Sequence, residues 1–148
     1  MPDKNTIERV REDAREGKSP STQAGEFVRE EIDHIREGKH GARSAKQAIA
    51  IGLSKARRAG VALPPPKGSA SKAVRIKAVQ DSEAASSRRA PSQTRSRATT
   101  KALKREGSKA ASTASLSRQA RTSAGNRSAA SRKSAAKKAA RTRAANSR

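Results

Sequence analysis

The chain contains no cysteine, tryptophan or tyrosine, and Phe27 is its only phenylalanine. The absence of cysteine excludes a disulfide framework and a thiolate metal site. The lack of aromatic side chains counts against a surface that stacks single-stranded bases, as RNA-recognition modules do. No apolar run approaches the roughly 18 residues needed to cross a bilayer, and the N-terminal segment MPDKNTIERV has no hydrophobic signal core. We therefore expect a cytoplasmic protein.

Acidic residues are scarce in the second part of the chain. Residues 1–60 hold 13 Lys and Arg against 10 Asp and Glu, whereas residues 61–148 hold 22 Lys and Arg against only Asp81, Glu83 and Glu106. The two net charges, +3 and +19, add up to the total of +22. Only 32% of the residues are hydrophobic, and most of these are alanine. Low hydrophobicity with a high net charge is typical of disordered chains, because burial cannot offset the conformational entropy lost on folding.

Two segments near the N-terminus carry helix start and stop signals. The first runs from Asn5 to Glu16, has a narrow apolar stripe and ends at Gly17. The second begins after Ser19, whose side chain can cap a helix, and continues through Pro20, which is tolerated at a first helical position because it has no amide proton to leave unpaired. Gly38 supplies its stop.

The clearest helix signal lies in the segment 43–60, RSAKQAIAIGLSKARRAG. Ser44 and Gln47 form a capping-box pattern, and small or apolar residues then recur at helical spacing until Gly60. The last turn is basic, which suits the negative end of a helix dipole, and it contains Lys55, Arg57 and Arg58.

The second and third helices are joined by only the short segment 38–43, and this favours an antiparallel hairpin. Gly52 and nearby alanines would let the two backbones approach closely. The expected apolar contacts are Phe27, Val28, Ile32 and Ile35 against Ile49, Leu53 and Ala56. A core this small supplies about 3 to 5 kcal/mol, so we expect added stability from a homodimer formed through the head or from a bound partner.

After residue 60, the run VALPPPKGSAS interrupts helical structure, because consecutive prolines lack amide donors and favour extended geometry. We therefore predict an all-α protein with three parts. Residues 1–60 form a small helical head, residues 61–71 a linker, and residues 72–148 a largely disordered cationic tail in which short helices form transiently. No fixed period in the tail signals a solenoid.

The stretches KSPSTQAGEFVREEI and EGKHGARSAKQAIAIGLSKARRAG resemble a family of small basic bacterial proteins built on a domain of unknown function, marked by a KQAIAIALS-type helix. Gly52 stands where many relatives have alanine. The tail segment KSAAKKAARTRAA is similar in composition to the tails of bacterial histone H1-like proteins. This resemblance implies a helical head and a bacterial source, but no defined biochemical activity.

The leading functional prediction is sequence-nonspecific DNA binding by the tail, in a nucleoid-associated role like that of histone H1. Each Lys or Arg that neutralises a phosphate releases counterions, so such binding weakens as salt rises. It would place the protein at the bacterial nucleoid. The candidate nucleic-acid-binding residues are Lys55, Arg57, Arg58, Arg88, Arg89, Arg95, Arg97, Lys101, Lys104, Arg105, Arg118, Arg121, Arg132, Lys133, Lys137, Lys138, Arg141 and Arg143.

Other readings of the same charge pattern stay open. The hairpin could recruit a protein partner while the tail binds RNA or ribosomes, and composition does not separate RNA from DNA. A helix-turn-helix that places the third helix in a groove is less well supported, since the preceding loop is long and the polar face is half Ala and Ser. Membrane insertion is the least supported, because the tail has no Trp, Phe or Leu face.

His34 and His40 are the only histidines, and both lie near the end of the second predicted helix. We expect them to be surface residues, since a metal site requires more convergent ligands than the sequence indicates. The acids around them have spacings that suit ion pairs on a helix surface. The sequence contains no nucleophilic triad, glycine-rich phosphate loop or metal motif, so we predict neither an enzyme nor a bound cofactor.

Overall fold

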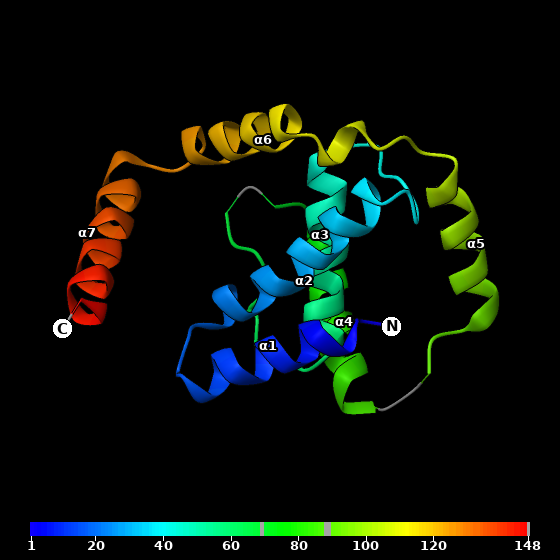
Figure 1. Ribbon diagram of the computed structural model, residues 1–148, viewed down its shortest axis with the longest axis horizontal. Helices are drawn as coiled ribbons and strands as arrows, with labels where there is room; N and C mark the ends of the chain where they lie inside the picture. The colour runs from blue at the N-terminus through cyan, green and yellow to red at the C-terminus, as the bar shows by residue number, and fades with distance from the viewer. Residues whose placement is uncertain (69, 88–89, 148) are drawn as a thin grey trace. The chain divides into compact units, whose positions relative to one another are not determined.

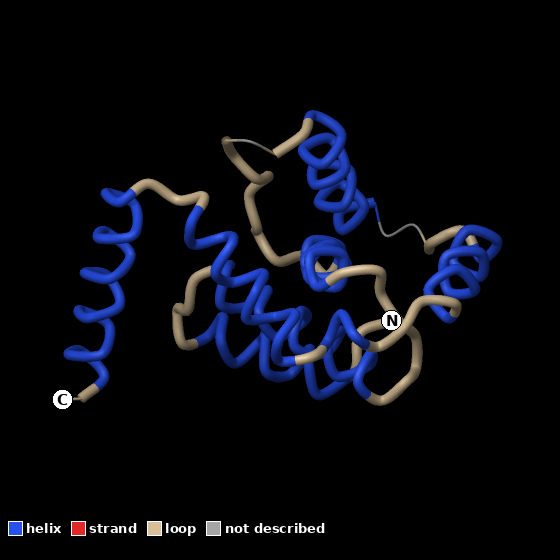
Figure 2. The backbone as a smooth tube through the Cα atoms, turned by 90° about the horizontal axis from the view of Figure 1, so that it is seen from above, coloured by secondary structure: helices blue, strands red, loops and turns tan. Residues whose placement is uncertain are grey.

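A computed structural model describes residues 1–68, 70–87 and 90–147 (Figure 1). Across these ranges the chain forms seven α-helices and one short 3-10 helix and contains no strand (Figure 2). This confirms the all-α prediction. The chain divides into two compact units, Met1–Ser112 and Thr113–Arg148.

The head contains the three predicted helices, α1 (Lys4–Arg15), α2 (Pro20–Arg36) and α3 (Ala45–Arg58). Each is followed by a glycine with positive φ, in chain order Gly17, Gly38 and Gly60, at 71°, 74° and 95°. These left-handed conformations let the chain leave each helix sharply, as the sequence predicted.

The starts of α2 and α3 also follow the prediction. The Ser19 hydroxyl accepts the amide of Thr22 at 3.4 Å, with proline at the next position. At α3 the Ser44 hydroxyl accepts the Gln47 amide at 3.2 Å, and the Gln47 carboxamide oxygen accepts the amide of Arg43 at 2.7 Å. The side chain of Gln47 therefore bonds back to Arg43, one residue before the cap Ser44, and this fixes the chain as it enters the helix.

The predicted hairpin is present, with α2 and α3 packed together and α1 packed on α2 (Figure 1). Phe27 is fully buried at the centre of one apolar cluster, against Val10 of α1 and Ala56 of α3. Val61 also belongs to this cluster, so the core includes the first residue of the predicted linker.

A second apolar cluster joins the hairpin to a segment far along the chain. Ile35 of α2 and Ala48 of α3 bury Ala110 and Ala111, which lie in the 3-10 helix η1 (Lys109–Ala111). The first compact unit therefore runs to Ser112 rather than ending at residue 60.

The expectation of a largely disordered tail is not supported. Four helices occupy that region, namely α4 (Lys72–Ser87), α5 (Gln93–Lys104), α6 (Thr113–Gly125) and α7 (Ala129–Asn146). Alanine, arginine, lysine and glutamine have high helix propensity, so this region forms helices although its composition is too polar to build a core. In addition, the Ser128 hydroxyl caps α7 by accepting the Ser131 amide at 3.1 Å.

Candidate functional site

The three basic residues at the end of α3 all have partners inside the first unit. Lys55 donates to Glu31 Oε2 at 2.6 Å, and Arg58 Nε donates to Asp81 Oδ1 at 2.8 Å. Arg57 is only 8% exposed and donates to the carbonyls of Leu63 and Pro64, at 3.4 and 3.3 Å. These cations therefore stabilise the first unit, and Arg57 also holds the start of the linker against α3.

Asp81 connects α4 to α3 through one carboxylate. It is 1% exposed and accepts hydrogen bonds from Ser54 at 2.6 Å, from Arg58, and from Lys77 within its own helix. Burial raises the pKa of the Asp81 carboxyl, but the hydrogen bonds from Lys77, Ser54 and Arg58 outweigh it and hold the pKa below its usual value. This network is the polar part of the α3–α4 contact.

The cations of the α5 region remain on the surface. Five predicted residues are exposed there, namely Arg95, Arg97, Lys101, Lys104 and Arg105. All but Arg95 line one shallow open hollow along the helix, together with Ser96 and Thr100. Arg97, Lys101 and Lys104 are four and three residues apart, which places them on one face of α5, and Arg105 follows at its end.

The second unit presents the most strongly basic surface. The predicted residues Arg118, Arg121, Arg132, Lys133, Lys137, Lys138, Arg141 and Arg143 are all exposed. No residue of α7 is buried, and the chain has no acid after Glu106. Arg88 and Arg89 lie outside the described residues. The structure thus brings eight predicted cations to α6 and α7 without a carboxylate in either helix.

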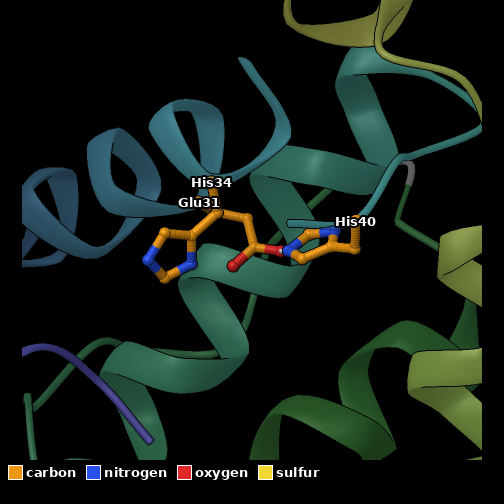
Figure 3. Close-up of side chains that lie close together, drawn as sticks. All are labelled: Glu31, His34 and His40. Carbon is orange, nitrogen blue, oxygen red and sulfur yellow. Dashed lines mark ion pairs between the residues drawn. The ribbon is translucent and has the colours of Figure 1, made fainter. Parts of the chain in front are cut away.

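The two histidines are only partly exposed, although the sequence predicts that they are surface residues. The side chains of His34 and His40 are only 13% and 14% exposed. Figure 3 shows their rings on opposite sides of the Glu31 carboxylate. One ligand atom from each of Glu31, His34 and His40 lies within 4.8 Å of the others. The turn after α2 brings His40 back over the helix, and spacing along the sequence does not reveal this contact.

Two carboxylates next to this cluster are buried. Glu31 is fully buried and Glu30 is 4% exposed, and the Oε1 atom of each makes an ion-pair contact, to His40 at 3.0 Å and to Lys55 at 3.8 Å, but accepts no hydrogen bond among the described residues. Glu30 Oε2 accepts the amide of Asp3 at 3.1 Å. A hydrogen bond from His34 lowers the pKa of Asp3. Buried, incompletely paired carboxylates are costly, so this end of α2 is the strongest candidate for an ion site in the head.

The described helices include none long and apolar enough to span a membrane. Residues 16–67 match a family of unknown function, DUF6496, and the match covers α2, α3 and the start of the predicted linker. The search of curated proteins and the search of solved structures gave no significant match. The match supports the predicted domain of unknown function and assigns no activity.

Proposed function

We propose that this protein binds DNA without sequence preference, through the exposed cations of α5, α6 and α7. The observation that carries the proposal is α7, which exposes six Lys and Arg residues and contains no acid. Such a helix offers phosphate groups many cations and no competing carboxylate. The proposed role is that of a nucleoid-associated protein.

The charge spacing on α7 suits a polyanion. Its six cations fall between Arg132 and Arg143, a stretch of 12 residues. At about 1.5 Å per residue the helix carries one positive charge per roughly 3 Å. DNA carries one negative charge per about 1.7 Å of its axis, so the two densities differ by less than a factor of two. The helix is therefore a better match to DNA than an extended chain of the same composition.

The arrangement of these cations favours phosphate contact over base readout. At 100° per residue the six positions point to most sides of α7 and do not form a single stripe. Apart from Asn146 at its end, the helix has no Asn, Gln or Glu to read base edges, and neither α6 nor α7 has an aromatic side chain. Binding should therefore depend on salt and hardly on sequence.

The head serves this function as a folded support. Lys55, Arg57 and Arg58 are candidates for DNA contact, but each has an intramolecular partner in the first unit, so we assign them to its stability. Its net charge of +3 is also small beside that of the remaining chain. We accordingly place DNA contact on the helices that follow α4.

Fluorescence anisotropy with the full chain tests the proposal. Two duplexes of unrelated sequence should bind alike at about 50 mM salt and far more weakly at about 200 mM. Changing Lys133, Lys137, Lys138 and Arg141 to Gln should reduce the slope of log affinity against log salt by about 3 to 4, at roughly 0.9 per phosphate contact.

A charge-matched control distinguishes tail binding from a general effect of net charge. It changes four exposed cations of the head to Gln, namely Lys4, Arg11, Arg15 and Lys46. This variant should retain most of the affinity and the slope. Equal losses in both variants, or an affinity insensitive to salt, would contradict the proposal. Tighter binding to a single-stranded or duplex RNA of equal length would assign the same surface to RNA.

A further inference from the structure

We propose that Glu31, His34 and His40 bind one divalent transition-metal ion of the zinc type, which ties the α2–α3 turn to α2. Imidazole nitrogens and a carboxylate oxygen are ligands that zinc accepts. This site is separate from the proposed DNA-binding helices, and its existence does not depend on that function.

Local backbone structure explains how the three ligands converge. Glu31 and His34 are three residues apart on α2, so they share a face of the helix. Beyond the helix end, the amide of Lys39 donates to the His34 carbonyl at 3.0 Å, and Gly38 adopts a φ of 74°. This turn reverses the chain and brings His40 to the same face.

The distance between Glu31 and His40 already suits two ligands of one ion. Glu31 Oε1 lies 3.0 Å from His40 Nε2, which makes an ion pair when the ring is protonated, but the contact lacks hydrogen-bond geometry. Two ligands held about 2.0 to 2.1 Å from a tetrahedral zinc ion are separated by about 3.3 Å, close to this distance. The oxygen and nitrogen are therefore spaced for an ion that both can bind.

His34 is held in an orientation that leaves its other nitrogen available. Its Nε2 pairs with Asp3 Oδ2 at 3.2 Å, which leaves Nδ1 as the ligand atom. Figure 3 shows the His34 ring beside the Glu31 carboxylate, opposite His40. A carboxylate that holds the far nitrogen of a metal-binding histidine is a common supporting contact in metal sites. Asp3 would play this part for His34, whose ligand atom already lies within 4.8 Å of those of Glu31 and His40.

The local charge balance also favours a cation. Asp3, Glu30 and Glu31 surround the site, and Lys55 is the one cation that contacts the two buried carboxylates among the described residues. With neutral histidines the four side chains carry a net charge of −2, which a divalent ion would neutralise. Lys55 occupies Glu31 Oε2, so Oε1 remains for the ion.

The sequence makes the test unusually direct, because His34 and His40 are the only histidines and the chain has no cysteine. The full chain, prepared without a histidine tag and stripped with a chelator, is titrated with Zn²⁺ while its imidazole ¹H–¹⁵N correlations are recorded. Both rings should shift at one equivalent, with coordination at Nδ1 of His34 and Nε2 of His40. Unchanged ring signals at saturating Zn²⁺ would overturn the proposal, and this experiment needs no variant.

Variants then measure the contribution of each ligand. His34→Gln and His40→Gln should each weaken Zn²⁺ binding by more than about 100-fold, and Asp3→Asn by about 10-fold. Asp33→Asn is the matched control, since this carboxylate lies beside His34 but is 47% exposed and outside the cluster. Zn²⁺ should raise the melting temperature of the wild type and of Asp33→Asn, but not that of the two histidine variants. Wild-type affinity in both histidine variants would refute the site.

Discussion

Gly52 of α3 lies against the backbone of Val28 on α2, so closely that a Cβ at Gly52 would be 2.6 Å from the Val28 Cα. Real Cβ atoms do not come this close to a backbone atom, and neither helix could yield without moving as a whole. The packing of the hairpin therefore depends on the absence of a side chain at Gly52 as well as on its apolar contacts.

Gly52→Ala should destabilise the head, although alanine is the better helix former. The overpacking cost of about 1 to 3 kcal/mol exceeds the gain of about 1 kcal/mol in helix propensity. Urea unfolding followed by circular dichroism measures the difference. Gly25→Ala is the control, because Gly25 lies in α2 with nothing near its Cβ position, and it should stabilise the protein. A stabilised Gly52→Ala variant would contradict the close contact.

Gly41→Ala should release the segment that ends in η1 while leaving the hairpin folded. A Cβ at Gly41 would collide with the carbonyl of Glu106, and the Gly41 amide donates to the Leu103 carbonyl at 2.9 Å. Hydrogen exchange should show the protection of the Ala42 amide, which donates to the Gly107 carbonyl, falling by at least about tenfold.

The same measurement on Gly107→Ala provides the control for this contact. A Cβ at Gly107 meets nothing within 4 Å, so the Ala42 amide should stay protected. Loss of protection throughout α2 and α3 in Gly41→Ala would show that the segment is needed for the hairpin itself.

Asp81→Asn should detach α4 from α3 and lower stability by about 1 to 3 kcal/mol, since a buried acceptor of three hydrogen bonds loses its charge. Because the folded-state pKa of Asp81 lies below its usual value of 3.8, the stabilisation is fully present above about pH 4 and is lost as the pH falls through the lowered folded value. The variant and the wild type should therefore converge only in strong acid. Urea midpoints from about pH 2 to 7 test this, with the exposed Glu83→Gln as the neutral control.

Lys55→Met should destabilise the head without weakening DNA binding. Removing this cation leaves Glu31 buried without its 2.6 Å partner, at a cost of about 3 kcal/mol. Lys46→Met, on the exposed face of the same helix, should have little effect on stability. If anisotropy showed the folded Lys55→Met variant losing affinity as an α7 variant does, Lys55 would contact DNA after all.

Much of the head could be predicted from local sequence. Ser19 with Pro20, and Ser44 with Gln47, mark the starts of α2 and α3, and Gly38 and Gly60 mark their ends, because capping and left-handed turns depend on residues within a few positions of one another. The short connection then favours a hairpin, and the excess of cations after residue 60 follows from counting.

The tertiary structure decided the contacts between distant parts of the chain. Whether Arg58 meets a phosphate or Asp81, and whether His40 faces solvent or Glu31, depends on how the chain turns and on which helices pack together. The tail was also harder to predict, because its low hydrophobicity signals the lack of a core but does not prevent alanine-rich segments from forming helices.

The sequence by itself determined the helical hairpin and the basic charge, since both depend on neighbouring residues or composition. Only the tertiary structure paired the cations of α3 within the first unit and brought the two histidines to one buried carboxylate, since these pairs form through packing.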